Sequence, residues 1–153
     1  MEQLYKKTVR ALVVDPDKHY RSILRSVLRN YGCGHIEDAG SVNQAFQLIP
    51  CFEPDIIFVE CNLPDISGLD FVHLVRSAKF LPRHDYPIML MTSLVRKSMV
   101  IKAAKFGADA FVLKPIQPSI IYERLQPLLS GRRSVFDRWD QISNSELPER
   151  LEI

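Results

Sequence analysis

The chain has 153 residues, of which 46% are hydrophobic and 25% charged, and its formal net charge is +2. This length supports one domain with a sizeable core, and the composition is that of an ordinary soluble globular protein. A net charge this small identifies no class of partner and neither requires nor excludes nucleic acid. The three cysteines, Cys33, Cys51 and Cys61, are odd in number and lack CxxC spacing, which argues against a disulfide scaffold and a zinc site.

Residues 1–7 lack the apolar stretch of a secretory signal, and no apolar run approaches the roughly 18 residues that span a bilayer. We therefore expect a cytoplasmic protein that does not cross a membrane.

Four unbroken apolar runs, each about as long as a strand, cover 11–14, 56–59, 88–91 and 110–113. Such runs are typical of parallel sheets that are buried on both faces. The mixed segment 35–39 suits an edge strand.

Helical patterns lie between these runs. The first is an apolar stripe that Gly32 ends, formed by Tyr20, Ile23, Leu24, Val27, Leu28 and Tyr31. Ser41 and Gln44 form a capping box before a second helix, which Pro50 is expected to close. Two further helices are predicted at about 68–78 and 97–106.

Pro118 opens a fifth helix, in which Pro127 predicts a kink or an early end near Gln126. Five β-α units predict an α/β fold with a flavodoxin-like, doubly wound, five-stranded parallel sheet of order 2-1-3-4-5 and five helices. We assign 1–130 to this domain. The segment 131–153 is expected to be a mobile tail or a docking segment, the latter because of Phe136 and Trp139.

Ligands of open α/β sheets bind at the carboxyl ends of the strands. Asp15, Asp17, Glu60, Thr92 and Lys114 follow or end the predicted strands. Carboxylates, a hydroxyl and a lysine in one place suit a hydrated cation and a phosphoryl group.

The same segments carry a family resemblance, in order and spacing, across roughly 8–130. They are Leu12 to Asp15, Pro54 to Pro64 with Gly68, Met91 to Ser93, Gly107 to Phe111, and Lys114 with Pro115. Together they resemble the receiver domain of bacterial two-component response regulators, the single-domain family that includes the chemotaxis regulator. The resemblance implies a signalling module and not an enzyme.

The resemblance also implies residue roles. Asp15 matches the first of two acids that hold magnesium, and Asn62 matches the residue whose carbonyl completes that site. Glu60 stands at the position of the phospho-acceptor aspartate. Thr92, Lys114 and Phe111 match switch and pocket residues, and the bond from Lys114 to Pro115 is implied to be cis.

Two departures define a pseudo-receiver: Glu60 replaces the acceptor and Pro16 replaces the second metal acid. Asp17 is nearby, but one position further along. We expect no cofactor, or magnesium held weakly, since that ion demands near-octahedral geometry. We expect Glu60 to pair with Lys114, to accept a hydrogen bond from Thr92, and to hold an active-like state.

Simpler roles remain open for several of these residues. Asp15 suits a helix N-cap, Thr92 suits a turn cap, and Lys114 suits a solvated surface position. Cys61 is expected to be an inert packed thiol.

The leading hypothesis is a signalling module that contacts a kinase, a phosphotransfer protein or an output protein. The implied partner face, which also suits a homodimer, includes Lys97, Ile101, Lys105 and Phe111. Membrane contact is not expected, and nucleic acid is not favoured. One alternative is a phospho-accepting regulator. Another is an anion- or nucleotide-binding adaptor with arginines from the tail and the first helix, namely Arg132, Arg133, Arg138, Arg21, Arg25 and Arg29.

Overall fold

The computed structural model describes residues 8–131 and 150–151. The parallel sheet consists of β1 (Arg10–Val14), β2 (His35–Ala39), β3 (Ile56–Glu60), β4 (Ile88–Thr92) and β6 (Ala110–Leu113). The helices are α1 (Lys18–Tyr31), α2 (Val42–Phe52), α3 (Gly68–Ser77), α4 (Lys97–Phe106) and α5 (Pro118–Leu129).

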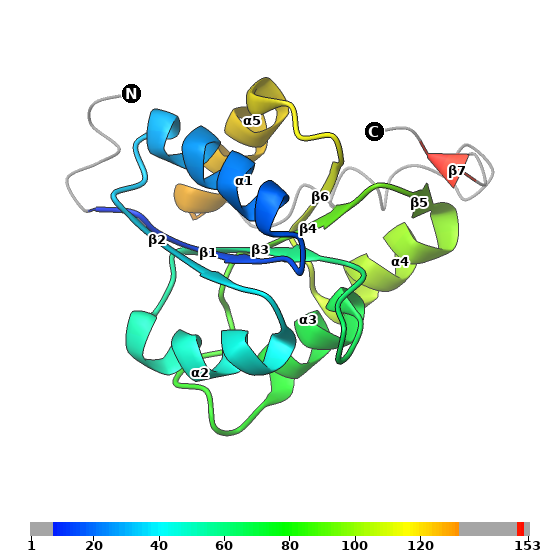
Figure 1. Cartoon of the computed structure of the whole chain (residues 1–153). Coiled ribbons are helices and arrows are strands. Elements are labelled where there is room, and N and C mark those ends of the chain that lie inside the picture. The colour runs from blue at the N-terminus through cyan, green and yellow to red at the C-terminus, as the bar shows by residue number, and fades with distance from the viewer. Residues whose placement is uncertain (1–7, 132–149, 152–153) are drawn as a thin grey trace.

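The order of the strands is β2-β1-β3-β4-β6, and every neighbouring pair is parallel. The predicted order 2-1-3-4-5 is therefore confirmed, with β6 as the fifth strand. Helices α1 and α5 cover one face of the sheet, and α2, α3 and α4 cover the other (Figure 1).

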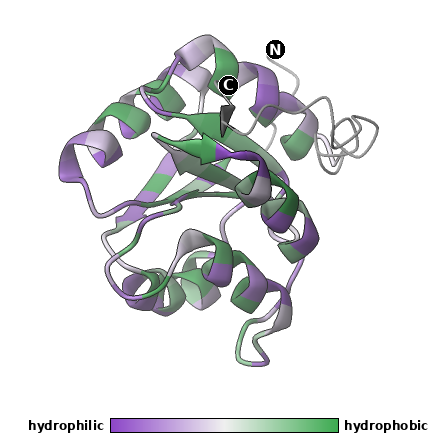
Figure 2. Cartoon of the chain, turned by 90° about the vertical axis from the view of Figure 1, so that its right-hand side faces the viewer, coloured by the Kyte–Doolittle hydropathy of each residue, from purple (hydrophilic) through white to green (hydrophobic). Residues whose placement is uncertain are grey.

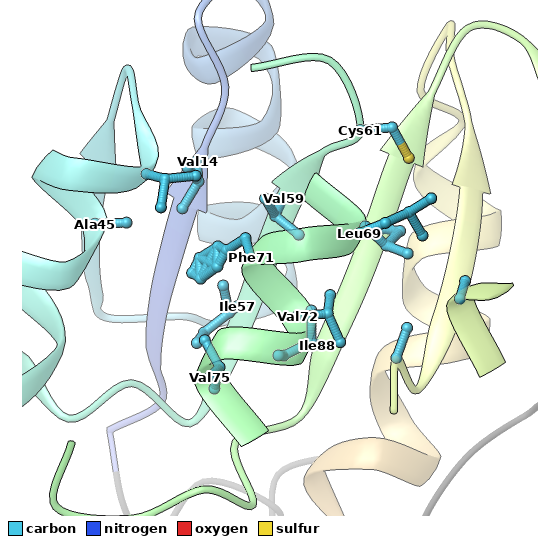
Figure 3. Close-up of a cluster of buried hydrophobic side chains, with 14 of the residues drawn as sticks. Val14, Ala45, Ile57, Val59, Cys61, Leu69, Phe71, Val72, Val75 and Ile88 are labelled. Carbon is cyan, nitrogen blue, oxygen red and sulfur yellow. The ribbon is translucent and has the colours of Figure 1, made fainter. Parts of the chain in front are cut away.

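Two apolar layers result, because alternate residues of each strand point to opposite faces. On one face, Ala11 and Val13 pack with residues of α1 and α5. On the other, Leu12 and Val14 pack with residues of α2, α3 and α4. Figure 3 shows that, in this second layer, side chains from the strands and side chains from the helices meet around Phe71. In Figure 2 the strands are mainly hydrophobic, while hydrophilic residues lie on the outer sides of the helices.

The helix boundaries confirm some predictions and correct others. Gly32 ends α1 in the left-handed conformation, with φ of 118°. Two prolines do not end their helices: α2 continues past Pro50 to Phe52, and α5 continues past Pro127 to Leu129. Residues beyond each proline pack on the core, including Phe52 and Leu128, and this burial favours continued helix over the cost of one lost hydrogen bond.

The amino end of α2 is capped from two directions. Ser41 accepts a hydrogen bond from the Gln44 amide, as the capping-box prediction requires, but the Gln44 side chain accepts from Gly40 and not from Ser41. The carboxylate of Asp65 accepts from the amides of Val42 and Asn43. The sequence did not predict this second cap, since Asp65 lies over 20 residues away along the chain.

Two short strands lie outside the main sheet. β5 (Val95–Arg96) pairs with β7 (Arg150–Leu151) in antiparallel fashion (Figure 1). The tail residues 132–149, with the three arginines, Phe136 and Trp139, lie outside the described residues. Within 8–131 and 150–151, no helix is both long and apolar enough to cross a bilayer.

Candidate functional site

The register of the sheet brings the predicted pocket residues to one edge. Val14 lies beside Val59, so that Asp15 follows β1 next to Glu60 at the end of β3. Thr92 ends β4 beside Leu113, and Lys114 comes directly after that residue. The carboxyl ends of parallel strands thus gather side chains from four strands.

Three of these side chains form a buried ion-pair cluster, which we call the carboxylate–lysine cluster: Asp15, Glu60 and Lys114. The Lys114 Nζ atom lies 2.6 Å from Asp15 Oδ2 and 2.6 Å from Glu60 Oε2. The three residues are 1%, 5% and 8% exposed in that order, which excludes a solvated surface role for Lys114. The predicted pairing of Glu60 with Lys114 is therefore present.

Burial alone lowers the pKa of Lys114, but the contacts with Asp15 and Glu60 outweigh that effect and raise it above its usual value. The lysine is therefore a firmly charged ammonium group between two carboxylates. Such a buried charged triad is stable only when each member keeps its partners.

The remaining carboxylate oxygens are also engaged. Asp15 Oδ1 accepts a hydrogen bond of 2.8 Å from the Asp17 amide, which closes an Asx turn around Pro16. Glu60 Oε1 accepts a hydrogen bond from the backbone N–H of Asn62 at 3.2 Å. Both oxygens of each acid are thus held by the protein itself.

Asp17 has a different role from the one considered for a pocket acid. Its carboxylate accepts from the His19 amide and caps α1. The N-cap role considered for Asp15 is thus wrong, since Asp17 occupies that position. Pro16 is exposed and supplies no ligand.

Thr92 lies at the pocket edge but does not complete the arrangement expected from the sequence. Its hydroxyl donates to the Leu94 carbonyl at 3.1 Å and accepts from the Leu94 amide at 3.3 Å. A hydroxyl has one proton to donate, and here the local turn takes it in place of Glu60. The turn-cap interpretation of Thr92 therefore describes its geometry.

Cys61 follows Glu60 and is buried. Burial and the negative charge of Glu60 raise the pKa of its thiol to about 12, although a hydrogen bond with Thr92 and the charge of Lys114 act in the opposite direction. A thiol with this pKa carries almost no thiolate at neutral pH, as expected for an inert packed cysteine.

The side chains fit a magnesium ion only in part. Two carboxylates, of Asp15 and Glu60, are available, and the ammonium of Lys114 already lies between them. Among residues 8–131, no group of three or more His, Cys, Asp or Glu side chains is arranged to hold a metal. The side chains alone therefore do not complete a metal site. The backbone N–H of Asn62 donates to Glu60, and the role implied for its carbonyl stays a prediction.

The surface residues of the implied partner face separate into two groups. Lys105 is exposed, while Lys97 and Ile101 are half-buried on α4. Phe111 is 2% exposed and belongs to the core, so its expected place on this surface is wrong: β6 is covered on both faces. The role of the α4 residues stays a prediction.

The arginine row of α1 is already partly used inside the domain. Arg21 and Arg25 contact the Asp38 carboxylate at 3.3 and 3.5 Å, and each also donates to a backbone carbonyl. These contacts disfavour an anion-binding row on α1, since Arg29 is the only one of the three arginines that is exposed.

Two further residues shape the pocket. The ring of Tyr20 lies 4.0 Å from Lys114 Nζ, although the helical stripe predicted only a core residue there. Gly68 lies so close to the pocket strand that a Cβ atom would come within 2.3 Å of the Glu60 carbonyl oxygen. Its place in the family pattern was the only sequence signal for this close approach.

The peptide bond between Lys114 and Pro115 is cis, as the resemblance implies.

Comparison with known proteins agrees with the geometry. The family model of the response regulator receiver domain matches residues 11–126. A chemotaxis protein CheY homolog of Campylobacter jejuni is 30% identical over 122 residues, which cover 79% of this chain and 92% of that protein.

Chemotaxis protein CheY-3 of Vibrio cholerae is 24% identical over 84% of this chain and 97% of its own length. A two-component response regulator of Clostridium difficile has a similar structure, with a TM-score of 0.71, 25% identity, and coverage of 80% of this chain and 97% of that one. The chain therefore belongs to the response regulator receiver domain family, whose members are non-enzymatic signalling modules.

Proposed function

We propose that this chain is a pseudo-receiver of a two-component or phosphorelay pathway, which acts through protein contacts without an aspartyl-phosphate cycle. The observation that carries the proposal is Glu60 at the acceptor position, buried and 2.6 Å from Lys114 Nζ. In this account the glutamate holds one signalling state without modification.

The chemistry of phosphoryl transfer supports this proposal. Transfer depends mainly on positioning and on neutralising charge at the phosphoryl oxygens. Glutamate extends its carboxylate by about one methylene beyond aspartate, and a misplacement of ~1 Å can reduce a rate on the order of 100-fold. Pro16 offers no metal ligand, and both oxygens of Asp15 are engaged by Lys114 and Asp17. Charge neutralisation is thus weakened as well.

The fixed state rests on the ion pair and not on Thr92. Glu60 reaches Lys114, which holds the carboxylate by a charge-assisted contact. The Thr92 hydroxyl donates to Leu94 and not to Glu60. The expected hydrogen bond from Thr92 to Glu60 therefore does not support an active-like state. The mimicry is also incomplete because a phosphoryl group has ≈ −1.5 to −2 charge and three acceptor oxygens.

We propose α4 as the surface for the partner, whether a kinase, a phosphotransfer protein or an output protein. The segment 93–108 contains Arg96, Lys97, Lys102 and Lys105 and no acidic residue. A basic surface of this kind favours a partner with an acidic contact region.

Beryllofluoride with magnesium, a non-covalent analogue of a phosphoryl group, provides the test. Amide spectra of the full chain are recorded with and without the analogue. We expect the pocket amides of wild-type protein to stay unchanged, because Glu60 fills the site and Pro16 supplies no ligand. The control is the double variant Pro16→Asp/Glu60→Asp, in which we expect shifts. Saturable shifts around Glu60 in the wild type would contradict the proposal.

A further inference from the structure

Tyr20 is set apart from the rest of its helix by what it contacts. Of the six residues in the apolar stripe of α1, the other five pack in or against the core layer shared with α5, and Tyr20 does not. Its ring instead faces the ammonium of Lys114, with 4.0 Å between Nζ and the ring centroid. The first residue of the stripe thus places an aromatic ring against Lys114 in the carboxylate–lysine cluster.

The ammonium of Lys114 is enclosed by three groups. A lysine ammonium has three N–H donors, and the carboxylates of Asp15 and Glu60 each approach Nζ to 2.6 Å. The ring of Tyr20 is the third neighbour, and the negative face of an aromatic ring attracts a cation, most strongly when water is excluded. With Lys114 only 8% exposed, this condition is met.

The first turn of α1 is anchored on both sides of Tyr20. Before it, the Asp17 amide donates to Asp15 Oδ1 at 2.8 Å. After it, Arg21 Nη1 donates to the Asp15 carbonyl at 2.6 Å. Because both anchors end on Asp15, the ring is held at a fixed position relative to the carboxylate–lysine cluster.

We propose that Tyr20 is a positioning residue whose ring closes the carboxylate–lysine cluster to water and holds the Lys114 ammonium against Glu60. The inference rests on the proposed function, because it names what keeps the Glu60–Lys114 pair in place. It concerns the aromatic ring and not the phenol hydroxyl, since the ring is the group that faces Nζ.

The test measures exchange of the Lys114 ammonium protons with water at one fixed pH, by NMR of full-length protein labelled with ¹⁵N at lysine. We expect slow exchange in the wild type and nearly the same rate in Tyr20→Phe, which keeps the ring. In Tyr20→Leu we expect exchange roughly tenfold faster, because the cation–π contact and the cover are both lost. Tyr122→Leu, a change on α5, is the matched control and should leave the Lys114 rate unchanged.

An unchanged rate in Tyr20→Leu would overturn the proposal, and so would equally fast exchange in Tyr20→Phe, which would assign the effect to the hydroxyl. If Tyr20→Leu fails to fold, Tyr20→Trp decides: protection at least equal to that of the wild type supports a ring-based role, and faster exchange rejects it. The proposed function is tested separately with Tyr20 intact, so either can fail without the other.

Discussion

At the scale of single residues, the candidate site is a cluster of buried charged groups of opposite sign. Asp15 and Glu60 share one cation, Lys114, and all three are nearly inaccessible to water. Burying a charge costs several kcal/mol unless it is paired. The lysine is therefore as important for the fold as it is for any signalling state.

Replacing Lys114 by Met removes that cation and leaves two carboxylates close together in the interior. We expect the free energy of unfolding to fall by roughly 3 kcal/mol or more, as for other buried ion pairs that lose one partner. Denaturant unfolding at neutral pH measures the change. Lys105→Met, at an exposed position of α4, is the control and should change the stability by less than about 0.5 kcal/mol. Equal stability of the two variants would show that the cluster is not a closed buried triad.

At the scale of elements, the loop after the pocket strand is tied to α2. The loop that begins at Cys61 carries Asp65, whose carboxylate accepts from the Val42 and Asn43 amides. Slight burial raises the pKa of Asp65, but the hydrogen bonds from Asn43 and Val42 outweigh it and lower the pKa below 3.8. The ionised form is thus the one that the helix end stabilises.

Asp65→Ala should therefore reduce stability at neutral pH, by up to about 1 kcal/mol for an exposed charge at a helix amino end. A lowered folded-state pKa gives stability that is present above the unfolded pKa and lost as the pH falls through the folded pKa. The difference between wild type and variant should consequently shrink in acid. Thermal unfolding across this pH range measures it, with Asp65→Asn as the control that keeps an acceptor without the charge. A difference that grows in acid would reverse the assigned sign.

Much of the sheet was predictable from the sequence because its strands are buried on both faces and therefore read as unbroken apolar runs. Most of the failures come from contacts that a local sequence pattern does not report. Pro50 and Pro127 carry a local signal to stop a helix, yet buried residues beyond them keep the helix going. Tyr20 and Asp65 have partners far away along the chain, and no local pattern reports such contacts. The prediction for Thr92 was wrong for a different reason. Its hydroxyl donates to the nearby Leu94 carbonyl in a local turn and not to the more distant Glu60.

At the scale of the whole molecule, the fold separates the buried carboxylate–lysine cluster from the basic surface of α4. The pocket lies at the carboxyl edge of the sheet, and β5 and α4 follow Thr92 directly in the chain. Any protein partner must therefore recognise the outer surface, because the pocket residues are buried.

Charge reversal at Lys97 and Lys105 tests α4 as that surface. We expect the double variant Lys97→Glu/Lys105→Glu to weaken partner binding while the melting temperature changes little, since substitutions on the surface of a protein usually alter stability by about 0.5 kcal/mol or less. Binding is measured by calorimetry with a partner isolated from the native host. Reversal at Arg29, exposed on α1 at the opposite face of the sheet, is the matched control. Unchanged binding in the double variant would place the interface elsewhere.

The most direct test of phosphorylation-independent signalling is the mass of the intact protein after incubation with acetyl phosphate and magnesium. We predict no added phosphoryl group on the wild type, because Glu60 is misplaced for transfer and paired with Lys114. The Pro16→Asp/Glu60→Asp variant, treated in parallel, should gain one base-labile phosphoryl group and so show that the reagents work. A stoichiometric, base-labile adduct mapped to Glu60 of the wild type would contradict the account.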